Sequence, residues 1–196
     1  MVITLANRKG GTGKTTSAAY LAQCLHRSGQ NVLGLDLDDE QSWKKWWDTG
    51  ALPYPVRVLG KKDDIGDHLD AHDGPVVIDT PPNDGEVIYK VSIRSDEVII
   101  PLSATSLDLN RLISTLQTVE EIEKMRRKPL ASILFTRWQG QHVLSQDAAA
   151  ALGKRSAPLL DARVRQLTRY AGFGTPSYLD EYEAVLSELG VHHAQA

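Results

Sequence analysis

Cysteine and long apolar runs are almost missing from this chain of 196 residues. Its single cysteine, Cys24, cannot form a disulfide within the chain, and a reducing cytoplasm suits such a composition. No apolar run approaches the roughly 18 residues that a membrane-spanning helix requires, so we expect no membrane span. The first apolar segment begins at residue 2, so we also expect no signal peptide. These absences argue against a disulfide-stabilised secreted scaffold and an integral membrane protein.

A strong excess of charge of one sign is missing as well. The chain has 22 Lys and Arg residues against 25 Asp and Glu residues, which gives a net charge of −3. This balance does not by itself indicate a nucleic-acid-binding protein, although basic residues gather at 124–128 and at 154–169. The length fits one α/β domain, and we expect residues 1–196 to form it.

Short apolar segments alternate with helical patterns along the chain. We expect strands at residues 2–6, 31–36, 56–59, 75–79, 98–101 and 131–135. We expect helices at residues 15–28, 63–71, 86–95, 107–125, 163–171 and 178–189. This order predicts an α/β fold with a doubly wound, mostly parallel sheet flanked by helices. Such sheets bind ligands at the carboxyl ends of their strands.

The most informative segment is residues 9–16, which read Lys-Gly-Gly-Thr-Gly-Lys-Thr-Thr between the first expected strand and the first expected helix. A glycine-rich turn in this context lets backbone N–H groups and the helix N-terminus face a phosphate. Lys14 then reaches the β- and γ-phosphates, and the Thr15 hydroxyl can ligate Mg²⁺. A plain glycine-rich turn would not require Lys-Thr-Thr at a helix start. The expected nucleotide-binding residues are Gly10, Gly11, Thr12, Gly13, Lys14, Thr15 and Thr16.

Two further strands are expected to end in acids. Asp36 and Asp38 are two residues apart, so in extended backbone they face the same side. One of them can support a metal ion and the other can orient an attacking water, although an acidic loop would look similar. The apolar segment 76–78 ends in Asp79, followed by Thr-Pro-Pro. A carboxylate in this position can hold Mg²⁺ beside Thr15, directly or through water.

Together these segments resemble the deviant Walker A ATPases of the ParA/MinD class, and most strongly the small ParA-type partition ATPases without an N-terminal helix-turn-helix domain. The mark of the class is a lysine at the front of the loop, which is Lys9 here. Arg8 stands at the position where the usual phosphate loop has a glycine. The resemblance implies ATP and Mg²⁺ as cofactors. It also implies catalytic roles for Lys9, Lys14 and Asp38, and metal ligation by Thr15, Asp36 and Asp79.

The resemblance further implies how the protein works. ATP favours a homodimer in which Lys9 reaches the partner's nucleotide; a phosphate contact within its own subunit is the alternative. Hydrolysis is slow and is stimulated by a ParB-like centromere-binding partner, which makes the protein a switch in plasmid or chromosome partition. The ATP state binds DNA non-specifically, so the expected location is the cytoplasm, associated with the nucleoid. The segment Asp39-Glu40-Gln41 departs from the Pro-Gln of the family, so Asp39 or Glu40 can replace Asp38 in orienting water.

Contacts to the base and to DNA are expected in the second half of the chain. By resemblance, Thr136 or Arg137 lies near adenine, with an ordinary surface loop as the alternative. Arg163, Arg165 and Arg169 have a spacing that can place them on one helix face, where they would contact DNA phosphates. A solvated helix face is the alternative to that DNA patch.

Other functions share part of this pattern. A membrane-bound positioning ATPase would need a basic amphipathic C-terminal helix, whereas residues 179–189 are acidic. A relative that positions another cargo, or that acts in conjugation, would carry the same motifs, and a nucleotide-gated binding module with negligible hydrolysis is the alternative of a different class. Trp43, Trp46 and Trp47 are spaced to share one helix side, as a core or dimer-interface stripe or as a docking patch for a partner.

Overall fold

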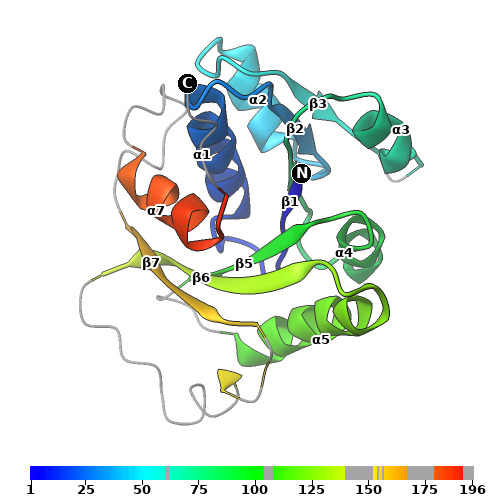
Figure 1. Ribbon diagram of the computed structural model, residues 1–196, viewed down its shortest axis with the longest axis vertical. Coiled ribbons are helices and arrows are strands. Elements are labelled where there is room, and N and C mark those ends of the chain that lie inside the picture. The colour runs from blue at the N-terminus through cyan, green and yellow to red at the C-terminus, as the bar shows by residue number, and fades with distance from the viewer. Residues whose placement is uncertain are drawn as a thin grey trace.

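The fold is built on a parallel sheet. The computed structural model describes residues 1–60, 62–103, 108–139, 152–153, 155, 157–166 and 179–191. Its strands are β1 (Val2–Leu5), β2 (Leu33–Asp36), β3 (Val56–Val58), β4 (Val76–Asp79), β5 (Glu97–Ser103), β6 (Leu130–Trp138) and β7 (Leu159–Arg165). They pair in the order β3-β2-β4-β1-β5-β6-β7, and every neighbouring pair is parallel (Figure 1). The central strands are continuous apolar runs because both faces of the sheet are covered.

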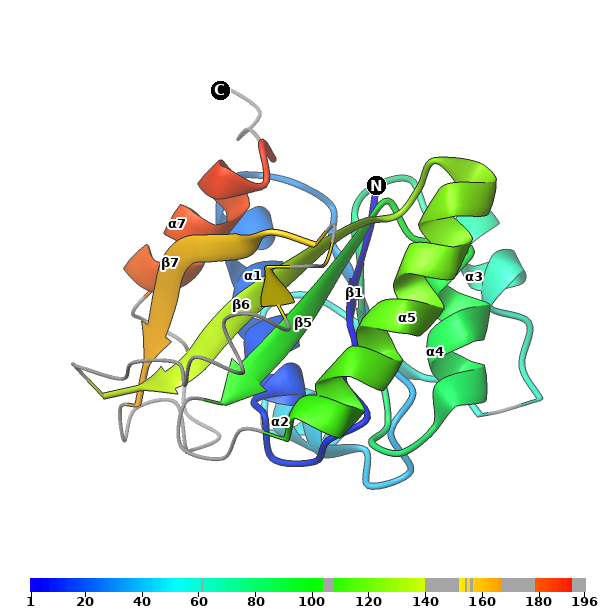
Figure 2. The ribbon, with the colours of Figure 1, turned by 90° about the horizontal axis from the view of Figure 1, so that it is seen from below.

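Helices cover both faces of this sheet. One face carries α1 (Lys14–Arg27), α2 (Ser42–Asp48) and α7 (Asp180–Glu188), which share a buried core with the inner strands. The opposite face carries α3 (Ile65–Asp70), α4 (Gly85–Ser92) and α5 (Leu109–Arg126), which pack over two further apolar clusters. Figure 2 shows α5 and α4 side by side on one side of β1 and β5, with α7 on the other side. The predicted doubly wound α/β fold is therefore confirmed.

The C-terminal part of the chain differs from the sequence prediction. The predicted helix at 163–171 is wrong at its start, because Arg163 and Arg165 belong to strand β7. Residues 160–165 alternate, with Leu160 and Val164 buried and the residues between them more exposed, as expected for an edge strand with one covered face. That alternation was the signal for a strand. Arg169 lies outside the described residues.

The topology gathers the predicted site at one edge of the sheet. Strand β4 lies between β1 and β2, and Asp79 is in register with Leu5 on one side and with Asp36 on the other. The loop that follows β1 and the acids that end β2 and β4 therefore meet at the carboxyl edge. This is the edge at which parallel α/β sheets bind ligands.

The tryptophans of α2 belong to the core. Trp43 is fully buried, Trp46 is 4% exposed, and Trp47 packs partly buried against the same cluster. The ring of Trp46 lies 5.9 Å from that of Tyr20 on α1. The core interpretation of this stripe is thus confirmed, and Trp43 and Trp46 are not accessible to a docking partner. Cys24 on α1 is also buried.

The membrane prediction agrees with the helices described. None of the helices in the described ranges combines the length and the apolar character needed to cross a bilayer.

Glu97, at the start of β5, makes stability depend on pH. Burial and the neighbouring Asp96 raise the pKa of Glu97 to about 7, with Lys128 opposing, from 4.5. Because the folded pKa lies above the unfolded one, ionising Glu97 costs folding free energy, and the cost grows as pH rises from about 4.5 to about 7. We expect Glu97→Gln to raise the free energy of unfolding near pH 8 and to leave it unchanged near pH 4. Urea unfolding across this range measures the difference.

The control for this experiment is Glu121→Gln on the exposed side of α5. It should shift stability by less than about 0.5 kcal/mol at every pH. An equal benefit of Glu97→Gln at both ends of the range would contradict the buried-acid explanation.

Candidate functional site

The glycine-rich loop between β1 and α1 has the backbone of a phosphate cradle. Gly11 and Gly13 have φ values of 71° and 88°, the left-handed region that glycine adopts without steric cost. Gly13 immediately precedes α1, so the helix N-terminus points into the loop. The Nζ atom of Lys14 reaches back over the loop and donates to the carbonyl of Lys9 at 3.4 Å. Backbone donors and one ammonium group therefore converge at the place where a phosphate would bind.

Hydrogen bonds to strands β5 and β6 hold the loop at Lys9, through Asn7, and at Thr12. Asn7 accepts a hydrogen bond from the Lys9 N–H at 2.8 Å and donates from Nδ2 to the Pro101 carbonyl, also at 2.8 Å. Thr136 on β6 donates to the carbonyl of Thr12 at 2.7 Å. The sequence analysis did not single out Asn7. The sequence pattern that could have identified Asn7 is a polar residue between a buried strand and Lys9.

A buried carboxyl lies beneath the loop. The Thr15 hydroxyl donates to Oδ2 of Asp79 at 2.6 Å. The other oxygen, Oδ1, is buried and has no hydrogen-bond partner among the described residues. Burial raises the pKa of Asp79 to about 7, and the Thr15 hydrogen bond opposes that rise. A bare buried carboxyl oxygen beside a hydroxyl fits a divalent cation, whose charge would favour the ionised form.

The protein supplies few ligands to such a cation. Within the described part of the chain, no three His, Cys, Asp or Glu side chains are grouped so that they could hold a metal ion. Magnesium sites of this kind use one or two protein oxygens and complete the shell with phosphate and water. The pair of Thr15 and Asp79 therefore fits Mg²⁺ that arrives with a nucleotide.

Asp38 lies close enough to Lys14 and Asp79 to interact with their charges. Burial lowers the pKa of Lys14, while Asp79 and Asp38 favour its charged form. Asp38 is partly buried, whereas Asp39 and Glu40 are exposed. Its Oδ1 accepts the backbone N–H of Glu40 at 3.0 Å, which fixes the turn. This placement favours Asp38 over its two neighbours as the acid that faces the phosphates; its role in orienting water stays a prediction.

Asp36 anchors the backbone of the same turn. Its carboxylate is fully buried, and Oδ2 accepts the N–H groups of Trp43 at 3.1 Å and Lys44 at 3.0 Å. Oδ1 accepts the N–H of Asp38 at 3.1 Å. Burial raises the pKa of Asp36, and these backbone donors oppose the rise. Asp36 thus holds Asp38 and the start of α2 together, and its predicted contact with a metal ion stays a prediction.

The predicted base contacts lie inside β6 rather than in a loop after it. Thr136 is buried with its hydroxyl engaged by the phosphate loop, so it supports the loop. Arg137 is exposed and has a left-handed φ of 50°, next to a register irregularity between β6 and β7. Contact of either residue with adenine stays a prediction.

The two arginines of β7 are engaged within the fold. The Arg163 guanidinium lies 5.2 Å from the ring centre of Phe135 and 5.7 Å from that of Trp138. Arg165 donates from Nε and from its backbone N–H to the carboxylate of Glu181 on α7. Neither arginine lies on a helix face, and a DNA contact by them stays a prediction.

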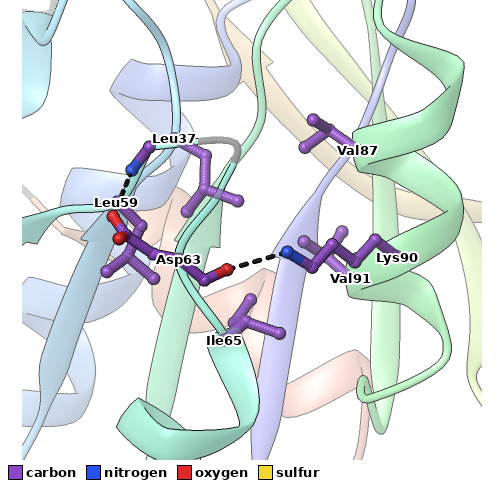
Figure 3. A pocket seen from close by; sticks show the side chains of 8 residues that line it. Leu37, Leu59, Asp63, Ile65, Val87, Lys90 and Val91 are labelled. Carbon is purple, nitrogen blue, oxygen red and sulfur yellow. Dashed lines mark hydrogen bonds between the residues drawn. The ribbon is translucent and has the colours of Figure 1, made fainter.

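A small hollow lies beside the site, between α4 and the segment that joins β3 to α3 (Figure 3). Lys90 closes one side by donating to the Asp63 carbonyl at 2.8 Å. The hollow has a volume of about 20 Å³, which is enough for a single water and too small for a nucleotide. The hollow is lined by Leu37, Leu59, Gly60, Asp63, Ile65, Val87, Lys90 and Val91.

Comparison with known proteins agrees with this geometry. The family model of the CobQ/CobB/MinD/ParA nucleotide binding domain matches residues 3–172. The chain belongs to this family. The resemblance of its loop to the ParA/MinD class is thereby confirmed, and members of this family share a nucleotide-binding domain.

Similar proteins carry names that refer to different processes. "Maintenance of carboxysome distribution protein A" of Gloeobacter kilaueensis is 30% identical over 174 residues, which cover 84% of this chain and 76% of that protein. "Chromosome-partitioning ATPase Soj" of Thermus thermophilus is 28% identical over 185 residues, covering 76% and 74%. The fold is similar to that of cobyrinic acid a,c-diamide synthase from Mycobacterium smegmatis, solved with an ATP analogue and magnesium. That match has a TM-score of 0.69 at 19% identity and covers 96% and 95% of the two chains.

The anchoring role of Asp36 can be tested by stability. Asp36→Asn keeps the shape of the side chain but replaces an acceptor oxygen with a donor that faces backbone N–H groups. We expect it to lower the free energy of unfolding by about 1–3 kcal/mol. Asp38→Asn, at the partly exposed neighbour, should cost less than about 0.5 kcal/mol. Urea unfolding without nucleotide measures both, and equal small effects would remove the anchoring role.

Proposed function

We propose that this protein is an ATP-dependent dimerising switch that hydrolyses ATP slowly and acts in plasmid or chromosome partition. The observation that supports it most is the hydrogen bond from Thr15 to Asp79 beneath the phosphate loop, with one Asp79 oxygen left bare. This arrangement suits a nucleoside triphosphate with Mg²⁺. Belonging to the CobQ/CobB/MinD/ParA family supports the same reading.

Each residue of the site has a role in this proposal. Lys14 and the N–H groups of residues 10–15 bind and orient the phosphates, so catalysis depends on position and charge rather than on covalent chemistry. Thr15 and Asp79 would hold Mg²⁺, which neutralises charge that develops on the phosphates. Asp38 orients the attacking water, and Asp36 keeps Asp38 in place.

Lys9 provides the switch. It is partly exposed, and its side chain starts at the front of the loop. In the proposed dimer it reaches the partner's nucleotide, so ATP favours the dimer and hydrolysis releases it. The difference in affinity between the two states is what drives the change.

Separate substitutions of the two lysines test this division of roles. Lys14→Ala removes a charged hydrogen-bond donor, so ATP affinity should fall by about 10- to 100-fold. Lys9→Ala should leave ATP affinity of the monomer within about threefold and abolish ATP-dependent dimers, because the contact it loses lies across the dimer. Titration calorimetry measures affinity, and sedimentation velocity measures the dimer.

The control is Lys45→Ala on the exposed side of α2, which should change neither quantity. A loss of affinity in Lys9→Ala as large as in Lys14→Ala would show that Lys9 serves the nucleotide of its own subunit.

The proposed partners are non-specific DNA in the ATP state and a ParB-like protein that stimulates hydrolysis, which would place the protein in the cytoplasm on the nucleoid. The similarity to a chromosome-partitioning ATPase supports this reading. The similarity to a carboxysome distribution protein supports a second candidate, a switch that positions another cargo. Both candidates use the same nucleotide site.

Binding to a random-sequence DNA duplex separates these candidates from a switch that does not use DNA. We expect binding with ATP, little with ADP or without nucleotide, and a steep loss with added salt. If Arg165 contacts phosphate, Arg165→Ala should weaken binding. Glu181→Gln, which removes the charge that holds Arg165, should strengthen it. In the same assay, the DNA affinity of Arg163→Ala shows whether Arg163 also contacts phosphate.

Fluorescence anisotropy at several salt concentrations gives the affinities. Binding that ignores the nucleotide, or no binding in any state, would contradict the DNA-based mechanism and favour a switch that acts through proteins alone. Unchanged affinity in the Arg165 and Glu181 variants would move the DNA contact away from β7.

A further inference from the structure

The residue that replaces the usual glycine of the phosphate loop, Arg8, connects three elements. Its backbone N–H donates to the Thr115 hydroxyl on α5 at 3.2 Å. Its carbonyl accepts the N–H of Asn83 at 2.9 Å, in the segment between β4 and α4. Its Nη2 donates to the Thr118 hydroxyl at 3.3 Å. One residue therefore holds the start of the loop against the segment that follows Asp79 and against α5.

Both threonines are prepared as acceptors. The Thr115 hydroxyl donates to the Arg111 carbonyl at 2.9 Å, and the Thr118 hydroxyl donates to the Ser114 carbonyl at 3.1 Å. A hydroxyl has one proton, and each of these hydroxyls donates it to a carbonyl of its own helix. Each threonine oxygen can therefore only accept from Arg8. The direction of these hydrogen bonds is thus fixed.

The guanidinium also fills the space beside Gly85, the first residue of α4. A Cβ at this position would lie 2.3 Å from Nη2, 2.6 Å from Cζ and 2.8 Å from Nη1 of Arg8. The φ of Gly85 is not left-handed, so alanine would meet no backbone strain there. The three nearest atoms that a Cβ at position 85 would meet thus all belong to the Arg8 head group. The Nε atom of Arg8 is buried and has no hydrogen-bond partner among the described residues.

We propose that Arg8 is a positioning residue of the ATPase site, which locks the phosphate loop and Lys9 to the segment Pro81–Asp84 and to α4 and α5. The proposal rests on the function proposed above. Pro82 lies next to the loop, because a Cβ at Gly10 would come within 3.8 Å of its Cβ. A change in the segment that follows Asp79 is therefore transmitted to Lys9 through Arg8. The side chain of Arg8 makes its hydrogen bond to α5, so it sets the geometry of the site and contributes little to ATP affinity.

A mutant cycle between Arg8 and Gly85 tests this. We expect Arg8→Ala to lower the turnover number by at least about tenfold, with the KM for ATP within about threefold, because misplacement by about an ångström is costly. Gly85→Ala should reproduce this loss by displacing the guanidinium. In an Arg8→Ala background, Gly85→Ala should change turnover no further, since the clash is gone. The matched controls are Arg126→Ala, at an exposed position of α5, and Gly60→Ala, where a Cβ would have room.

The outcomes separate the two proposals. If the unmodified protein hydrolyses ATP and the two substitutions multiply in their effects, the positioning role is overturned and the proposed function stands. A KM that rises as much as turnover falls would also overturn it, because Arg8 would then serve binding. If the unmodified protein does not hydrolyse ATP with or without DNA, both proposals fail. Urea unfolding of all four cycle members shows whether any loss of turnover reflects unfolding instead.

Discussion

The site depends on one constraint, the placement of a carboxyl group in the middle of a sheet that is covered on both faces. Asp79 ends β4 between β1 and β2, and it is completely buried. An ionised carboxylate in such surroundings is costly unless opposite charge or donors compensate it. Thr15 supplies one donor, and the raised pKa of about 7 shows that this is not sufficient. Lys14 also favours the ionised form, and a cation bound next to this carboxyl group would favour it further.

The second strand resolves the same problem differently. Asp36 is also fully buried, yet its two oxygens accept three backbone N–H groups. Those donors fix the turn that carries Asp38 and the start of α2, where Trp43 enters the core and Tyr54 links it to α1 through a hydrogen bond to the Ala19 carbonyl. The acid therefore contributes to rigidity, whereas Asp79 stays available to bind. Two acids with similar sequence settings have different uses because one is surrounded by backbone donors and the other is not.

The central part of the fold and the meeting of the candidate site residues at one sheet edge could be predicted from sequence because their signals are local. Residues 9–16 and the apolar strands that end in Asp36 and Asp79 specify the loop, the strand ends and their shared edge. The register that places Asp79 between Leu5 and Asp36 follows from the parallel topology. Strand β7 was missed because an edge strand with one covered face has a weak, short alternation. The contacts of Arg8 were not predictable, since Thr115 and Thr118 are more than one hundred residues away in the chain.

The same division explains why the nucleotide chemistry of the proposed switch is easier to infer than its cargo. The phosphate loop and the acids lie at the carboxyl ends of the central strands, and Thr15 lies in the first turn of α1, where burial and register fix their positions. The arginines proposed to contact DNA lie at the periphery, where β7 forms the sheet edge and where Arg163 and Arg165 already have partners in the fold. A peripheral arginine can bind phosphate only by giving up such a partner, so its affinity is the difference between two similar interactions. That difference depends on neighbours such as Glu181, which accepts from Arg165.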